Sequence, residues 1–236
     1  MYKKLALPLK AVLFDMDNTL FDFIAAKLVA CREVLACLEA EGGEKVGSSA
    51  ELFNYFLRGV HGFEDYENIL DYMQDSRLFT VQGYRQCCEI YEREKLENIE
   101  LYPGVRDTLE ELKKLDLKLA IITDADRAHA RARLARVGLL SSFDLLVAFD
   151  MTGAKKPDPA PFLFALRALG VRPEETLVVG DSIRRDMTPA RQLGLNTAYA
   201  AYGDWRAQEE TGTCFDFRLE NFPDLVDCVR TLNRQR

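Results

Sequence analysis

The sequence predicts an α/β protein with a mostly parallel, Rossmann-like sheet, helices on both faces and an inserted all-α domain. Two observations indicate the sheet: short apolar runs alternate with helical segments over residues 99–236, and these runs are apolar on both faces, as in buried parallel strands. A third observation indicates the insertion, because only helical periodicity is found over residues 22–98.

The first predicted strand is the apolar run over residues 11–14, which ends at Asp15. Asp17, Asn18 and Thr19 follow closely. Carboxylates at the exit of a buried strand lie where open α/β sheets bind ligands, outside the carboxyl ends of the strands. An isolated Asp-x-Asp pair is more often a turn, because Asp and Asn side chains bond their own backbone there.

Helical periodicity begins after Asp22, a candidate N-cap. Apolar residues then repeat at spacings of four and three, which gives one buried helix face: Ile24, Leu28, Cys31, Leu35 and Leu38. Gly42 and Gly43 end this helix. Three more helices are predicted in the same block, near residues 51–58, 65–73 and 82–96.

The α/β alternation resumes at Pro103, which suits a helix start. The later strands are predicted at residues 118–122, 145–148, 177–179, 197–201 and 214–217. Helices are predicted near residues 105–115, 125–137, 157–169, 187–193 and 223–232. We therefore expect an α/β core of residues 1–21 and 99–236 and a helical cap of residues 22–98 that can close over the strand ends.

Composition narrows the possible partners and the location. The 236 residues are 48% hydrophobic and carry a net charge of −7 without a basic block, so nucleic acid is a poor candidate partner. No apolar run approaches the ~18 residues of a membrane span. The apolar stretch after Met1–Lys4 is short and contains Pro8, unlike a signal peptide. These features predict a cytoplasmic protein that does not bind membranes.

Cysteine and histidine usage narrows the possible chemistry. None of the six cysteines forms a C-x-x-C pair, so we expect small buried side chains in a reducing compartment. Only His61 and His129 are present, which argues against a histidine-rich metal site or a Ser-His-Asp triad. The chemistry must therefore depend on carboxylates, lysine and a hydroxyl.

Four predicted strands end in such groups, and in a parallel sheet these ends share one edge. The groups are Asp15 with Asp17, then Thr123, then Lys156, then Asp181 with Asp186. Each has an ordinary alternative: a helix cap for the threonine, a solvated side chain for the lysine, turns for the aspartates. Their joint occurrence at strand exits favours one functional site.

These residues stand in four motifs that resemble those of the haloacid dehalogenase-like superfamily, most of whose members are phosphatases. The motifs are Asp-Met-Asp-Asn-Thr at 15–19, Thr123 after a strand, Lys156 in Lys-Lys-Pro-Asp-Pro, and Gly-Asp-Ser-Ile-Arg-Arg-Asp at 180–186. Asn18 stands where glycine is frequent, and Asp124 where asparagine or glycine is often found. The resemblance covers residues 10–23 and 101–236; the cap matches only in its position and helicity.

The resemblance implies a Mg²⁺-dependent phosphatase that forms an aspartyl-phosphate. Asp15 would be the nucleophile and Asp17 the general acid and base. The metal ligands would be the Asp15 and Asp181 carboxylates and the Asp17 carbonyl. Asp186 would either contact the metal through a water molecule or orient Lys156. Thr123, Asp124 and Lys156 would bind the phosphoryl oxygens.

Several alternatives remain open from the sequence. A dehalogenase uses the same nucleophile without metal, a sugar-phosphate mutase retains a bisphosphorylated intermediate, and a regulator would keep the fold only for binding. The cap resembles those of phosphoglycolate and glyceraldehyde 3-phosphate phosphatases, so the expected partner is a small phosphorylated metabolite. Arg58 and His61 are candidate substrate contacts, with surface turn residues as the alternative. The sequence does not indicate an oligomeric state.

Overall fold

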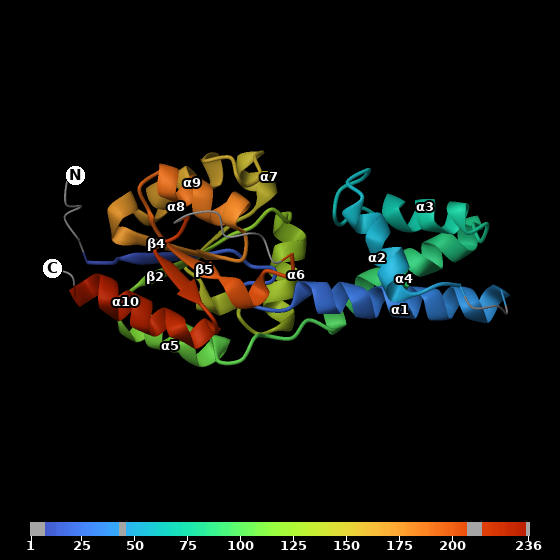
Figure 1. Cartoon of the computed structure of the whole chain (residues 1–236), viewed down its shortest axis with the longest axis horizontal. Helices are drawn as coiled ribbons and strands as arrows, with labels where there is room; N and C mark the ends of the chain where they lie inside the picture. The colour runs from blue at the N-terminus through green and yellow to red at the C-terminus, as the bar shows by residue number, and fades with distance from the viewer. Residues whose placement is uncertain (1–7, 43–45, 207–213, 235–236) are drawn as a thin grey trace. The chain divides into compact units, whose positions relative to one another are not determined.

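The computed structural model describes residues 8–42, 46–206 and 214–234. Two sequence-based expectations involve residues outside these ranges: Gly43 at the end of the first predicted helix, and the first seven residues, which were expected not to form a signal peptide. The chain divides into two compact units, Met1–Asp22 with Leu101–Arg236, and Phe23–Glu100. We call them the core unit and the helical unit; each is drawn in Figure 1.

The core unit contains one six-stranded sheet in the order β3-β2-β1-β4-β5-β6. The strands are β1 (Ala11–Phe14), β2 (Lys118–Ile122), β3 (Leu145–Val147), β4 (Thr176–Gly180), β5 (Asn196–Ala200) and β6 (Phe217–Leu219). All neighbouring strands pair in parallel, so their carboxyl ends lie along one edge. This sheet confirms the predicted fold class.

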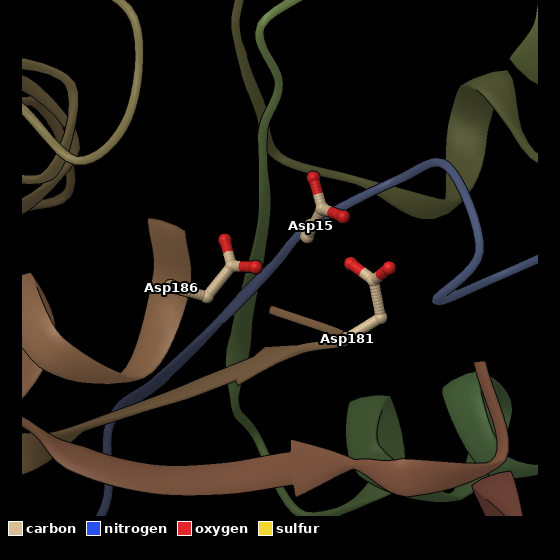
Figure 2. A group of neighbouring side chains, drawn as sticks. All are labelled: Asp15, Asp181 and Asp186. Atoms are coloured by element: carbon tan, nitrogen blue, oxygen red, sulfur yellow. The ribbon is translucent and has the colours of Figure 1, made fainter. Parts of the chain in front are cut away.

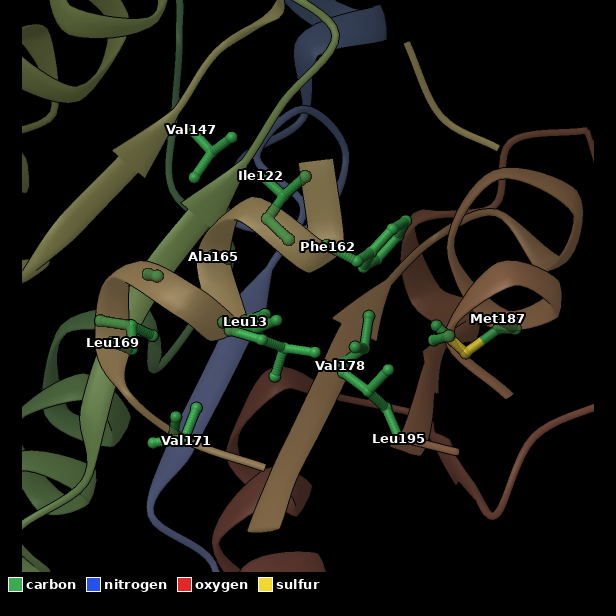
Figure 3. Packing of buried hydrophobic residues seen from close by; sticks show 14 of the residues in the cluster. Leu13, Ile122, Val147, Phe162, Ala165, Leu169, Val171, Val178, Met187 and Leu195 are labelled. Carbon is green, nitrogen blue, oxygen red and sulfur yellow. The ribbon is translucent and has the colours of Figure 1, made fainter. Parts of the chain in front are cut away.

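Helices cover both faces of the sheet (Figure 1). The core helices are α5 (Val105–Lys114), α6 (Arg127–Arg136), α7 (Phe149–Thr152), α8 (Ala160–Leu169), α9 (Thr188–Gln192) and α10 (Leu225–Arg234). Figure 1 shows α5 and α10 on one face and α8 and α9 on the other. Successive side chains of β1 point to opposite faces of the sheet, so the strand packs against helices on both. Leu13 joins a buried cluster with Phe162 of α8 (Figure 3), while the ring of Phe14 stacks on Phe222.

The last strand begins later than predicted. Residues 214–217 were expected to form it, but β6 pairs with β5 only from Phe217, opposite Ala198. The Asp216 carboxylate accepts hydrogen bonds from the Thr197 N–H and hydroxyl, at 2.9 and 3.0 Å. The Asp216 N–H also donates to the Thr197 carbonyl at 3.1 Å. Side-chain bonds together with one backbone bond therefore join Asp216 to β5 ahead of the strand, which the apolar pattern could not indicate.

Two short helical elements also differ from the prediction. A single helix was expected over residues 187–193, but a π-helical turn, Ile183–Met187, precedes α9. The four-residue helix α7, Phe149–Thr152, was not predicted. Neither element is long enough to show the apolar periodicity by which helices are found in a sequence.

The helical unit consists of α1 (Phe23–Gly42), α2 (Ser49–Leu57), α3 (Glu67–Asp75) and α4 (Val81–Glu97), and no strand lies among its described residues, 23–42 and 46–100. Side chains cap two of these helices: Ser48 and Glu51 form a capping box at α2, and Thr80 caps α4. Cys31 and Cys87 lie in the apolar core of this unit. Of the other cysteines, Cys228 is buried and three are half-buried, so the expectation of burial holds only in part.

Within the described ranges, none of the helices has the length and apolar character that crossing a bilayer requires.

The chain leaves the core unit after β1 and returns to it at the same place. Phe21 and Leu101 face each other in an isolated antiparallel bridge. The Tyr102 N–H donates to the Leu20 carbonyl at 3.0 Å. The two connections to the helical unit are therefore held together where they leave the sheet.

A close backbone contact supports the loop after β1. Asn18 has a φ of 60°, in the left-handed region that Asn tolerates better than most residues. This backbone conformation suits an Asn at a position where glycine is frequent in the resembled family. The Tyr202 hydroxyl donates to the Thr19 carbonyl at 2.8 Å. Next to it, a Cβ on Gly203 would lie only 1.7 Å from the Asn18 carbonyl oxygen.

We expect Gly203→Ala to destabilise the fold, because the added methyl group meets backbone that cannot rotate away. A loss of about 3 kcal/mol or more is expected, at the upper end of overpacking costs. Gly153→Ala is the matched control: its φ is 69°, but no atom lies within 4 Å of the new Cβ. It should cost only about 1–2 kcal/mol of left-handed strain. Urea unfolding measures both, and equal losses would contradict the steric argument.

Candidate active site

Three carboxylates converge at the carboxyl edge of the sheet (Figure 2). Asp15 follows β1, Asp181 follows β4, and Asp186 lies on the π-helical turn. All three are buried, and one oxygen from each lies within 4.8 Å of the others. The structure thus brings Asp15 together with two aspartates that lie more than 160 residues further along the chain.

Asp186 reaches this group because the chain folds back tightly after β4. The Ser182 N–H donates to Asp186 Oδ2 at 3.2 Å. Gly180 gives the carboxylate room, since a Cβ there would lie 2.5 Å from Asp186 Cγ. The spacing of the fourth motif therefore matches a specific turn in which glycine permits the close approach.

The Lys156 ammonium group joins two of these carboxylates. Its Nζ donates to Asp15 Oδ1 at 2.5 Å and to Asp186 Oδ1 at 2.6 Å. The side chain is 1% exposed, so the alternative of a solvated lysine is wrong. Its backbone N–H donates to Asp124 Oδ1 at 2.8 Å, which ties the loop after α7 to the end of β2.

The charges of the site shift one another's pKa values. Burial is the largest single effect and opposes ionisation of both Asp15 and Lys156, but the opposite charges around each group together outweigh it. Lys156 and Arg185 therefore lower the pKa of Asp15, and Asp15 with Asp186 raises the pKa of Lys156. Burial, followed by repulsion from Asp15, raises the pKa of Asp181. The pKa of Asp186 is also raised, mainly by burial. The carboxylates are thus only partly compensated by the chain's own cations.

A second cation, Arg185, was missed by the sequence analysis. Its guanidinium lies 3.4 Å from Asp124 Oδ2 and 3.5 Å from Asp181 Oδ1. It lies immediately before Asp186 in the fourth motif, which was the available signal. The other Asp124 oxygen accepts from the Lys156 N–H, so the Asp124 side chain links its own loop to those of Lys156 and Arg185. The assignment of Asp124 to phosphate binding stays a prediction.

Thr123 is buried directly after β2, as expected for a group at the strand edge. Its hydroxyl accepts a hydrogen bond from the Ala125 N–H at 3.2 Å, and α6 begins shortly after, with Asp126 as its N-cap. Binding of an anion by the threonine hydroxyl and neighbouring N–H groups stays a prediction.

Asp17 has a buried partner that the sequence analysis did not identify. Its Oδ2 accepts a hydrogen bond from the Arg133 guanidinium at 2.7 Å. The Arg133 side chain is 2% exposed and that of Asp17 is 23% exposed. The missed signal was an arginine on the inward face of α6, where Ala130 and Leu134 are also buried.

The two candidate residues of the helical unit contact one carboxylate of that same unit. Arg58 lies 3.4 Å and His61 3.1 Å from Asp71 Oδ2. The guanidinium also lies 3.5 Å from the centre of the Tyr55 ring. Their expected contact with substrate stays a prediction.

The donor set fits a divalent cation. Asp15, Asp181 and Asp186 offer carboxylate oxygens, the ligands that Mg²⁺ prefers. With Lys156 and Arg185, three carboxylates face two cationic side chains. Burial and then repulsion from Asp15 and Asp186 raise the pKa of Asp181, and one bound cation would offset that repulsion.

A parallel α/β sheet here gathers carboxylates, a lysine and a threonine at its carboxyl edge, where open α/β sheets bind their ligands. The comparison with known families identifies the class of protein. Residues 9–194 match the model of the haloacid dehalogenase-like hydrolases. The chain belongs to this hydrolase family, which confirms the resemblance seen in its four motifs.

Relatives match over nearly the whole chain. A glyceraldehyde 3-phosphate phosphatase from Methanocaldococcus jannaschii is 28% identical, covering 96% of this chain and 99% of its own. Pyrophosphatase PpaX from Halalkalibacterium halodurans is 36% identical, covering 94% and 97%. A crystal structure of a HAD phosphatase from Thermococcus onnurineus aligns with a TM-score of 0.67 and 25% identity, covering 94% and 98%.

Proposed function

We propose that this protein is a Mg²⁺-dependent phosphatase that hydrolyses a small phosphorylated metabolite through an aspartyl-phosphate on Asp15. The observation that carries the proposal is the buried Asp15 at the end of β1, 2.5 Å from Lys156 and beside Asp181 and Asp186. The names of the phosphatases among its relatives support it.

In the proposed reaction, one Asp15 oxygen attacks phosphorus. The new bond is an acyl phosphate, and the bond from phosphorus to the ester oxygen breaks. Water then attacks phosphorus, which releases phosphate and restores the Asp15 carboxylate. Asp15, Asp181, Asp186 and the Asp17 carbonyl would hold the Mg²⁺, which supplies positive charge against the phosphoryl oxygens.

The other residues divide the remaining work. Asp17 gives a proton to the departing oxygen and then receives one from the attacking water. Lys156 and the Thr123 hydroxyl, with the N–H groups near Asp124, donate to the phosphoryl oxygens as charge spreads over them. Lys156 also fixes the direction of the Asp15 carboxylate before substrate arrives.

The helical unit is proposed to act as a cap that determines specificity, because it is inserted directly after the loop that carries Asp15 and Asp17. The partner is a small phosphorylated metabolite; phosphoglycolate, glyceraldehyde 3-phosphate and pyrophosphate are the first compounds to test, because relatives carry the names of all three. A cytoplasmic location stays a prediction.

The test is a substrate screen with Mg²⁺ that measures released phosphate over a panel of phosphorylated metabolites. We expect phosphate release from at least one monoester. Isomerisation of a sugar phosphate without phosphate release would favour a mutase, and halide release from a haloacid would favour a dehalogenase. Binding of a panel member without turnover of any compound would favour a regulatory role.

We predict that turnover requires a divalent cation, because the Asp15, Asp181 and Asp186 carboxylates repel one another when only the chain's own cations face them. Excess chelator should abolish nitrophenyl phosphate hydrolysis and added Mg²⁺ should restore it. Asp181→Ala should raise the Mg²⁺ concentration for half-maximal rate steeply. Full activity of the metal-free enzyme would contradict the assigned site.

We predict that Asp17→Asn separates the two chemical steps. Nitrophenolate leaves without much protonation, so phosphorylation of Asp15 proceeds, but the attacking water lacks its base, a loss on the order of 10²–10⁴-fold. A burst of about one nitrophenolate per site should precede slow turnover. Mass spectrometry after acid quench should locate one phosphoryl group on Asp15. A group on Asp17 instead would reverse the two roles.

A further inference from the structure

Arg133 is a buried cation that the proposed reaction leaves without a role. It lies in the second turn of α6, and its side chain is 2% exposed. Its guanidinium Nη1 donates to Asp17 Oδ2 at 2.7 Å. The helix that carries it begins directly after Thr123 and Asp124, so one short segment supplies residues to two parts of the site.

The position of Arg133 in α6 would suit an apolar side chain. Ala130, Leu134 and Val137 lie on the same inward face and are all buried. The neighbouring arginines, Arg131 and Arg136, are exposed. A guanidinium is costly to bury unless it is paired and hydrogen-bonded, so packing alone does not account for an arginine at this point.

The carboxylate paired with Arg133 belongs to Asp17, whose orientation matters for the proposed proton transfers. Asp17 has two rotatable side-chain bonds, and the proposed proton transfers need one of its oxygens near both the leaving oxygen and the attacking water. A carboxylate anchored through one oxygen can exchange a proton through the other. Misplacement of a reacting group by about 1 Å can cost 10²-fold in rate.

We propose that Arg133 is a positioning residue that holds the Asp17 carboxylate in the orientation for proton transfer. This inference rests on the proposed function, in which Asp17 is the acid and base. Arg133 acts through Asp17 and touches no reacting atom. Its planar fork of donors fixes direction as well as charge, which a lysine at the same position would not do.

Three variants test the proposal: Arg133→Met removes the guanidinium, Arg133→Lys keeps only the charge, and Arg131→Met is an exposed control on the same helix. Thermal unfolding first establishes that each is folded. Initial rates with Mg²⁺ are then measured for nitrophenyl phosphate and for a simple alkyl phosphate, whose leaving oxygen needs a proton.

Arg133→Met should lower kcat for the alkyl phosphate by about 10²-fold with little change in KM, in the range of a lost general acid. Nitrophenyl phosphate should instead give a burst of about one nitrophenolate per site, as in Asp17→Asn, because phosphorylation of Asp15 needs little protonation whereas the later attack of water is slowed. Arg133→Lys should lose less, about 10-fold, and Arg131→Met should match the wild type. In an Asp17→Asn background, Arg133→Met should add almost nothing, because the group that it orients is gone.

Equal slowing of the phosphorylation step for both substrates, or full additivity with Asp17→Asn, would show a merely structural role and overturn the proposal. If Arg133→Met does not fold, Arg133→Lys carries the same comparison. A crystal structure of the variant gives a readout independent of turnover: the Asp17 carboxylate should leave its wild-type direction. An unchanged Asp17 overturns the inference, whereas a wild type inactive on every monoester overturns only the proposed function.

Discussion

Asp15→Asn is expected to abolish turnover and to leave no covalent phosphate on the protein. The amide is a poor nucleophile, and it also loses the charge that pairs with Lys156. The expected fall in kcat is on the order of 10⁴-fold or more, comparable to the removal of a nucleophile elsewhere. Phosphate release and intact mass after acid quench measure the two effects together.

Asp107→Asn is the matched control for this prediction, because it makes the same change at an exposed position of α5. It should behave as the wild type in both assays. A phosphorylated Asp15→Asn protein, or one with ordinary turnover, would place the nucleophile elsewhere.

Lys156→Met should damage both stability and activity. It removes the ammonium group that bridges Asp15 and Asp186, and both carboxylates are buried. Breaking a buried ion pair from one side typically costs about 3–5 kcal/mol. The cost should appear in urea unfolding of the metal-free protein, and it should shrink when Mg²⁺ is added, since a bound cation offsets the same charges.

Lys155→Met tests whether this effect belongs to the site. Lys155 is the preceding residue but is exposed, with its ammonium over the Phe149 ring. We expect a change within about 0.5 kcal/mol, as for ordinary surface substitutions. A Lys156→Met protein as stable as Lys155→Met would contradict the role of the ammonium group in compensating the carboxylates.

Strands with long apolar runs were predicted well from the sequence. β1 and β2 have the predicted bounds, and β4 extends the predicted run by one residue at each end. These strands lie in the middle of the sheet, where both faces are buried and hydropathy alone defines them. Because such strands are parallel, the residues that follow them share one edge, which is why the aspartates could be grouped before the structure was known.

Features that depend on side-chain contacts could not be predicted in this way. The start of β6 depends on the Asp216 carboxylate, which bonds to β5 ahead of the strand. The partnerships of Arg133 with Asp17 and of Arg185 with Asp124 join helices to loops far along the chain. A sequence with 31 lysines and arginines gives no direct signal for which of them become buried.

The bridge between Phe21 and Leu101 has an evolutionary consequence. Because the two ends of the helical insertion are already paired at the core unit, a shorter, longer or unrelated insert needs only ends that meet the same spacing. Such an exchange would alter neither the strand order nor the register of β1 against β2 and β4. New specificities could thus arise by recombination at one point of the gene, while the residues that perform the chemistry are inherited unchanged.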